Sequence, residues 1–141
     1  MLTAGTATAD TPGSSAVVNA FYKWYFSVNG TRAGWSGHLS EAKPYLTASL
    51  YALLTKMVAK EKNGGGAILD FDPFVDAQEM ATSFKVGTPS GSQVPVTFGF
   101  GKSSEHSRVT AIVHSGSTWQ IDNFSYGSDG NLRTMLQQQM K

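Results

Sequence analysis

The sequence has no cysteine, and only 15% of its 141 residues are charged. Without cysteine the chain cannot form disulfides, use a thiolate nucleophile or bind a metal through thiolates. The net charge is only +1, so we expect no binding to nucleic acid or to an anionic membrane surface. No apolar run approaches the ~20 residues that span a bilayer. The 40% hydrophobic content is typical of a folded domain, and the length suits a single one.

Large side chains are scarce at the start of the chain. Residues 1–16 consist mainly of Thr, Ala, Gly and Ser, which predicts a flexible leader ahead of a single domain at residues 17–141. Within this leader Ala7-Thr8-Ala9 has the small-x-small form of a signal-peptidase site, although the basic and apolar regions that normally precede such a site are missing. Two interpretations stay open, the remnant of an export signal and an ordinary tail.

Two helices are predicted in the first half of the domain. Residues 17–28 carry apolar side chains at helical spacing, and Pro12 and Ser14-Ser15 are plausible start signals ahead of them. Asn29-Gly30 is a strong stop signal because both residues tolerate the left-handed conformation. A second helix is expected from Pro44 through Val58. The loop between the helices carries Trp35, which we expect to be exposed.

Strands are predicted in the second half of the domain. Residues 82–86, 94–100, 108–114 and 119–124 each alternate apolar and polar side chains, as strands with one buried face do. Pro95 cannot donate a ladder hydrogen bond, so its end of the strand is expected at a sheet edge or a bulge. Asp129 is the expected cap of a short final helix. This order predicts an α+β fold, with two N-terminal helices packed on a curved four-stranded antiparallel sheet that closes into a cone with an open mouth.

Four of the ten acidic residues lie in one segment, from Asp70 to Glu79. The segment begins Asp-x-Asp, as a calcium loop does. However, Val75 stands where an EF-hand needs glycine, and Ala81 stands where it needs glutamate. The sequence therefore does not predict a calcium loop here.

Two other interpretations of this segment stay open. Asp70 and Asp72 could form a carboxylate pair for acid–base catalysis, which requires a raised pKa. Alternatively, Asp72 accepts backbone N–H groups ahead of Pro73, and the neighbouring phenylalanines anchor the segment. The sequence favours this structural role, which still allows Asp70 or Asp72 to line the mouth of a pocket.

Other catalytic signatures are missing. His38, His106 and His114 form no pair at zinc-binding spacing, and the sequence has neither a Gly-x-Ser-x-Gly elbow nor a phosphate-binding glycine loop. A Ser-His-Asp triad stays open, because its members need not be near one another in sequence. We therefore predict no catalytic residue, no metal and no cofactor.

Aromatic residues make a ligand pocket the main alternative to a filled core. Buried Tyr and Trp side chains bring polar groups that need partners, and several of them in a small core would suit a planar or apolar ligand. Core filling is the default interpretation. Trp35 is the candidate for a protein interface. The candidates for lining a pocket are Tyr22, Tyr25, Asp70, Asp72, Phe74, Gln78, Trp119 and Asp122.

Three stretches of the chain together resemble a known family. Residues 17–25, 70–78 and 119–126 are similar to the bacterial domain of unknown function 3828 family, and the Asp-Pro-Phe-x-Asp-Ala-Gln stretch is the most specific piece. The resemblance covers about Ser15 to Leu136. It implies a nuclear transport factor 2-like (cystatin-like) cone and a periplasmic or secreted location, because the family is found largely in exported proteins and lipoproteins. A cytoplasmic location stays open, and the family supplies no catalytic residues.

Three hypotheses about function follow. The first is a non-catalytic domain of the bacterial cell envelope that binds a small molecule or a protein partner. The second is a small-molecule enzyme for proton transfer or hydrolysis, with Asp70 or Asp72 as base and Tyr22 or Tyr25 as hydrogen-bond donor. The third is an inhibitor or immunity-type protein that acts through a surface around Trp35. A homodimer packed through the sheet is a further expectation, by analogy with other cone folds.

Overall fold

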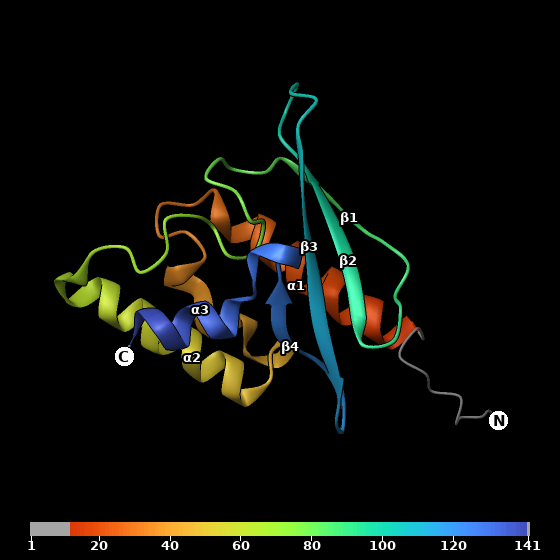
Figure 1. Ribbon diagram of the computed structural model, residues 1–141, viewed down its shortest axis with the longest axis horizontal. Coiled ribbons are helices and arrows are strands. Elements are labelled where there is room, and N and C mark those ends of the chain that lie inside the picture. The colour runs from red at the N-terminus through yellow and green to blue at the C-terminus, as the bar shows by residue number, and fades with distance from the viewer. Residues whose placement is uncertain (1–11, 141) are drawn as a thin grey trace.

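The computed structural model describes residues 12–140, so the Ala7-Thr8-Ala9 motif lies outside the described residues. The described chain is α+β (Figure 1). Its elements, in chain order, are α1 (Pro12–Asn29), a 3₁₀ segment (Ser36–Tyr45), α2 (Ala48–Lys60) with a π-helical turn (Glu61–Gly65), β1 (Ser83–Val86), β2 (Gln93–Gly99), β3 (His106–Ser115), β4 (Trp119–Ser125), a 3₁₀ turn (Gly127–Asp129) and α3 (Leu132–Gln139).

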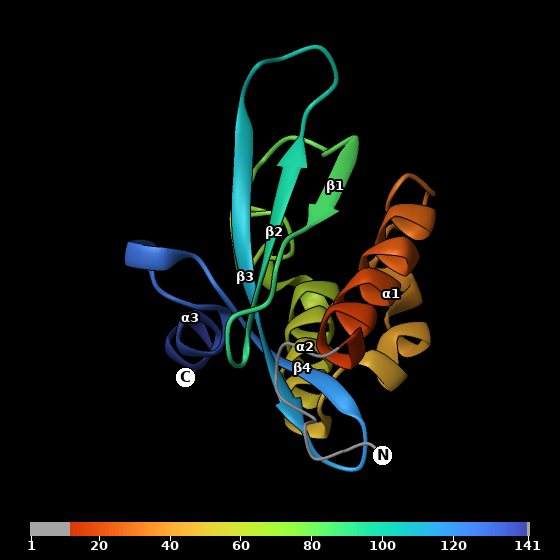
Figure 2. The same cartoon turned by 90° about the vertical axis from the view of Figure 1, so that its right-hand side faces the viewer.

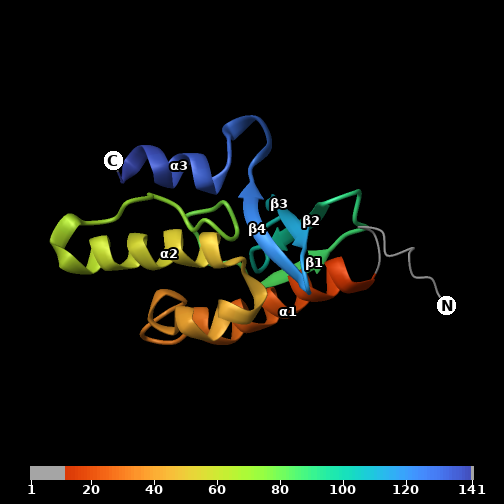
Figure 3. The same ribbon diagram turned by 90° about the horizontal axis from the view of Figure 1, so that it is seen from below.

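The strands form one antiparallel sheet in the order β1-β2-β3-β4, as the sequence predicts. Helix α1 lies across one face of this sheet and contacts every strand, whereas α2 and α3 lie beside β4 (Figure 3). Alternate residues of the strands are buried on the α1 side, for example Val94, Val96 and Phe98 of β2. The pairing register of β3 with β4 shifts between Ile112 and Val113, and the sequence pattern does not predict this irregularity.

Pro95 lies where the sequence places it. Strand β1 pairs with β2 only as far as Val96, and Gly87, the residue after β1, donates its N–H to the Pro95 carbonyl at 2.7 Å. Beyond this point the described residues place no further strand on this side of β2, and only an isolated Ser90–Gln93 bridge follows. The expected edge position is therefore confirmed, because Pro95 offers no N–H to continue the ladder.

Aromatic side chains fill the space between α1 and the sheet. The rings of Phe21 and Phe74 lie 5.1 Å apart, and those of Phe74 and Phe124 lie 5.2 Å apart, both edge to face. Tyr22 packs on Phe98 at 5.2 Å in the same geometry. Such edge-to-face pairs add stability beyond the buried area. The interior beside α1 is therefore a packed core.

The first helix is longer than the sequence predicts. It begins at Pro12, so residues 12–16 belong to the helix and not to a leader. Pro12 is a favourable first helical residue because its missing N–H would have no partner there. Gly13 is needed in this turn, since a Cβ atom at this position would lie 2.5 Å from Cδ1 of Trp119. Packing against β4 thus extends the helix into a stretch of small residues.

The predicted starts of the other helices are wrong by a few residues. Helix α2 begins at Ala48, because the Thr47 hydroxyl accepts the Leu50 N–H at 3.3 Å as an N-cap, whereas Pro44 lies inside the 3₁₀ segment. Helix α3 is capped by Asn131, whose side-chain oxygen accepts the Thr134 N–H at 3.0 Å. Asp129, the predicted cap, lies in the preceding turn.

Candidate functional site

Hydroxyl groups from three distant parts of the chain hold the acidic segment in place. Each bonds to a different residue of the stretch from Asp72 to Val75. Tyr25 donates to the Asp72 carboxylate (2.5 Å), and Tyr126 donates to the Pro73 carbonyl (2.7 Å). Tyr22 donates to the Phe74 carbonyl (2.6 Å), and Ser107 donates to the Val75 carbonyl (2.6 Å). The position of this segment is therefore fixed by α1, β3 and the end of β4 together.

The segment itself folds as a tight turn. The Asp72 carboxylate accepts the Phe74 N–H at 2.9 Å, and the Asp72 N–H donates to the Ala77 carbonyl at 2.8 Å. Asp76 closes the turn with a φ of +53°, a left-handed conformation that Asp tolerates better than most residues. Asp72 thus makes the local bonds that the structural interpretation predicts, and it adds a bond to Tyr25 that the sequence does not show.

The Tyr25–Asp72 pair has an unusual electrostatic environment. Burial raises the pKa of Asp72, while the hydrogen bonds from Tyr25 and from the Phe74 and Val75 backbone oppose the rise. Burial, followed by the Asp72 charge, raises the pKa of Tyr25 well above its ordinary value. Tyr25 is therefore a neutral donor to Asp72, and it accepts a bond from the Asn29 side chain at 2.9 Å.

This pair brings a phenol and a carboxylate together, as the enzyme hypothesis requires, but it lacks room for a substrate. Tyr25 is 1% exposed, and Tyr22 and Phe74 beside it are 0% exposed. A catalytic pair must contact the reacting atoms. The bonds of Tyr25 and Asp72 instead satisfy each other and the turn.

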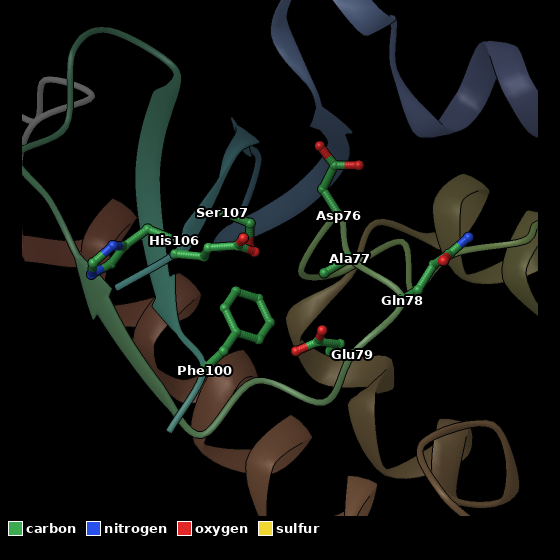
Figure 4. A pocket seen from close by; sticks show the side chains of 8 residues that line it. Asp76, Ala77, Gln78, Glu79, Phe100, His106 and Ser107 are labelled. Atoms are coloured by element: carbon green, nitrogen blue, oxygen red, sulfur yellow. The ribbon is translucent and has the colours of Figure 1, made fainter. Parts of the chain in front are cut away.

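A hollow of about 320 Å³ is lined by the end of the turn and the residues that follow it, positions 76–79 (Figure 4). The Phe100 ring lies in its middle, and the Glu79 carboxylate points toward this ring, whereas Asp76 and Gln78 point away from it. Glu105 also lines the hollow. The hollow thus combines an aromatic ring with the carboxylates of Glu79 and Glu105, while the third carboxylate of its lining, that of Asp76, points away from the ring. Its lining residues are Asp76, Ala77, Gln78, Glu79, Phe100, Glu105, His106 and Ser107.

The candidate pocket residues are distributed over several places. Tyr22, Tyr25, Asp72 and Phe74 meet at the turn, where Tyr22 and Phe74 are core residues with no surface left for a ligand. Gln78 alone among the candidates lines the hollow, and its amide donates to the backbone carbonyl of exposed Asp70 at 3.1 Å.

The remaining candidates have structural contacts elsewhere. Trp119 covers the first turn of α1 at Gly13, and the Asp122 carboxylate accepts from Thr47 at 2.8 Å and from Arg133 at 2.7 Å. Trp35 is only half-buried and not fully exposed as predicted, because its ring packs edge-on against Phe74 at 4.6 Å. It therefore caps the core.

Sequence reasoning missed the residues that the β2–β3 hairpin contributes to the hollow. Phe100 and Glu105 lie more than twenty residues from Glu79, and only the antiparallel pairing of β1 with β2 brings them together. Met80 was missed as well, although it is 59% exposed and follows Glu79 directly. No local pattern marks these residues, because strand periodicity predicts faces and not neighbours across a loop.

The structure defines this protein as an α+β domain with a filled core and an acidic, aromatic hollow at its surface. Within residues 12–140 no group of three or more His, Asp or Glu side chains is placed to hold a metal ion. No helix in this described range is long and apolar enough to cross a membrane. No family model, curated protein or solved structure matches the chain.

Proposed function

We propose that this protein is a non-catalytic binding domain of the bacterial cell envelope, with a nuclear transport factor 2-like cone fold. The sequence resemblance supports the fold family and the exported location, and the helix α1 that lies across the sheet is compatible with such a cone. The ligand is a lysine or arginine side chain of a protein partner. The hollow between Glu79 and Phe100 is the observation that carries this proposal.

The chemistry of the hollow favours a cation. An ammonium or guanidinium group is attracted to the face of an aromatic ring, and carboxylates nearby neutralise its charge. Phe100 supplies the ring, and Glu79 and Glu105 supply the carboxylates. Burial, and then the Asp129 carboxylate, raises the pKa of Asp76 at the same turn, which is consistent with an excess of negative charge there.

The exposed Met80 favours a protein partner over a free amine. The exposed Met80 side chain follows Glu79 directly, and Met adapts its shape to different partner surfaces. Residues 72–75, which lie four to seven positions before Glu79, are already held by the hydroxyl groups of Tyr22, Tyr25, Ser107 and Tyr126. A preorganised surface lowers the ordering cost of binding.

The enzyme hypothesis has less support. Its phenol and carboxylate are bonded to each other at 2.5 Å inside a packed region. The interface hypothesis built on Trp35 is replaced by one built on Glu79 and Met80, since Trp35 packs on Phe74. The first change moves the proposed function from the interior of the fold to its surface, and the second moves the proposed interface from Trp35 to the hollow.

The test is an NMR titration with N-acetyl-lysine methylamide, its neutral analogue N-acetyl-norleucine methylamide, and butylamine. The lysine probe is expected to bind at millimolar concentration and to shift amides of residues 76–80, 100 and 105–107. It should bind more tightly than butylamine, because only the amino-acid probe reaches Met80. If butylamine binds as tightly as the lysine probe, the hollow is a site for free amines. If the norleucine probe binds as tightly as the lysine probe, the proposal is wrong.

Two variants complete this experiment. Glu79→Gln combined with Glu105→Gln removes the charges and should weaken lysine binding by about fivefold or more. Asp70→Asn is the matched control, because Asp70 belongs to the same acidic segment but does not line the hollow. A similar loss in Asp70→Asn would mean that the overall charge of the segment, and not the hollow, binds the probe.

A further inference from the structure

The two edges of the sheet differ in how they are covered. The outer edge of β4 is occupied by the chain itself, since the Thr47 N–H donates to the Ile121 carbonyl at 2.9 Å and Ser125 forms a bridge with Asn131. Strand β1 pairs with β2 on one side and is the outermost strand on the other (Figure 2). An uncovered strand edge is a template for pairing with another extended chain.

The hydrogen-bond alternation shows which groups of β1 face outward. The Gly87–Pro95 contact is a hydrogen-bonded position, so in an antiparallel pair Lys85 and Ser83 occupy the next two such positions. The N–H and C=O groups of Phe84 and Val86 then point away from β2. These groups bond to no other part of the described chain.

A groove runs beside this edge. It measures about 580 Å³ and lies between the end of β1 and the first turns of α1. Phe26 of α1 packs on Phe84 at 5.1 Å, so the helix touches β1 at one end and leaves room at the other. The side chains facing the groove from α1 are small, which leaves space for a strand. The lining residues are Ser15, Ala16, Asn19, Lys85, Val86, Gly87, Thr88 and Pro89.

The described charges around the groove are positive. Among residues 12–140, Lys85 is the only charged residue that lines it, and Lys23 follows Asn19 by one helical turn on the same face of α1. Neither lysine forms an ion pair with another residue of the described range. A residue placed directly opposite Lys85 in an added strand would lie within about 5 Å of it, Cβ to Cβ. A carboxylate there would find an unpaired cation.

We propose that an extended segment of a protein partner adds to β1 as a fifth strand and places an acidic side chain opposite Lys85. Its backbone would bond to the outward groups of Phe84 and Val86. This mode of binding takes its affinity from main-chain hydrogen bonds and its specificity from side-chain contacts. The surface is separate from the hollow at Glu79, so it does not depend on the function proposed above.

A second copy of this chain is a poorer occupant. Consider two copies of β1 that pair antiparallel about a twofold axis. The outward groups of Phe84 and Val86 all find partners only if Phe84 of one strand faces Val86 of the other. This register places Lys85 opposite Lys85, and like charges directly opposite are destabilising. Any other symmetric register leaves some outward groups without a partner. The edge thus favours a foreign, acidic strand.

The test uses three synthetic peptides and the whole protein. The probe acetyl-Thr-Val-Glu-Val-Thr-amide is expected to shift the amides of Phe84 and Val86 at millimolar concentration and to slow their hydrogen exchange. The same peptide with Lys in place of Glu should bind about fivefold more weakly. A version with both valines N-methylated cannot donate from these positions and should not bind. Failure of the first peptide to affect these amides, or equal binding of all three, would overturn the proposal.

Two variants separate the backbone from the charge. Val86→Pro removes an outward N–H that the ladder with β2 does not use, and it should abolish binding of the Glu peptide. Lys85→Gln keeps the backbone and should bind the Glu and Lys peptides equally. If the amides of Phe84 and Val86 instead shift with protein concentration alone, a second copy occupies the edge and the proposal is wrong.

Discussion

Tyr25→Phe removes one hydroxyl and tests whether the Tyr25–Asp72 pair stabilises the fold. The hydroxyl donates to the Asp72 carboxylate at 2.5 Å and accepts from Asn29 at 2.9 Å. A hydrogen bond to a charged group contributes about 1.5–3 kcal/mol, and its loss leaves a half-buried carboxylate without one donor. We expect the free energy of unfolding at about pH 7 to fall by about 2 kcal/mol in chemical denaturation.

The pH dependence of this loss has a definite sign. The pKa of Asp72 in the folded protein lies above its ordinary value of 3.8, so the carboxyl group favours folding most below that pH, and this contribution is lost as pH rises through the folded pKa. Tyr25→Phe removes a bond that lowers the pKa, so the folded pKa rises further. The deficit of the variant should therefore be full at neutral pH and shrink as pH falls toward 3.8.

A double-mutant cycle with Asp72→Asn isolates the pair. The coupling between Tyr25→Phe and Asp72→Asn at about pH 7 is expected to be about 1–2 kcal/mol. Tyr45→Phe is the matched control, because Tyr45 is half-buried and its hydroxyl bonds to no other described residue. It should change stability by less than about 0.5 kcal/mol. A coupling below about 0.5 kcal/mol, or a deficit that does not vary with pH, would refute the reasoning.

Two further substitutions test the local geometry. At Asp76, where φ is +53°, replacement by Gly should be neutral or stabilise by up to about 1 kcal/mol, whereas replacement by Val should destabilise by about 1–2 kcal/mol in thermal unfolding; equal effects would contradict the strained backbone. Arg133→Lys should cost about 1 kcal/mol, because one ammonium cannot reproduce the fork that bonds the Asp122 carbonyl and carboxylate and the Ser49 hydroxyl. Exposed Arg32→Lys, which has no such contacts, serves as its control and should leave denaturation unchanged.

Local patterns predicted the elements well, and the termini of the elements less well. The four strands and the stop at Asn29-Gly30 follow from side-chain alternation and backbone preference, which act within a few residues. The starts of the helices depend on contacts outside the segment. Thr47 caps α2 because its backbone is tied to Ile121, and Pro12 joins α1 because Trp119 packs on the next residue.

The candidate site was predictable only in its local part. The bonds that Asp72 makes to its own turn follow from an Asp-Pro-Phe sequence. The bonds from Tyr25, Tyr126 and Ser107 do not, because these residues lie 47, 53 and 32 positions from their partners. A hydroxyl that satisfies a buried carbonyl and one that faces a ligand look the same in sequence.

The sequence by itself excluded disulfides, thiolate nucleophiles and thiolate metal ligands, because it has no cysteine. It also determined the order of the helices and strands, because periodicity is a property of short stretches. The tertiary structure decided that the aromatic side chains fill a core and that Asp72 bonds to Tyr25. It also placed Glu79 beside Phe100 and left one edge of the sheet open. These features depend on which distant residues become neighbours, and only the packing of α1 and the hairpins on one another sets that.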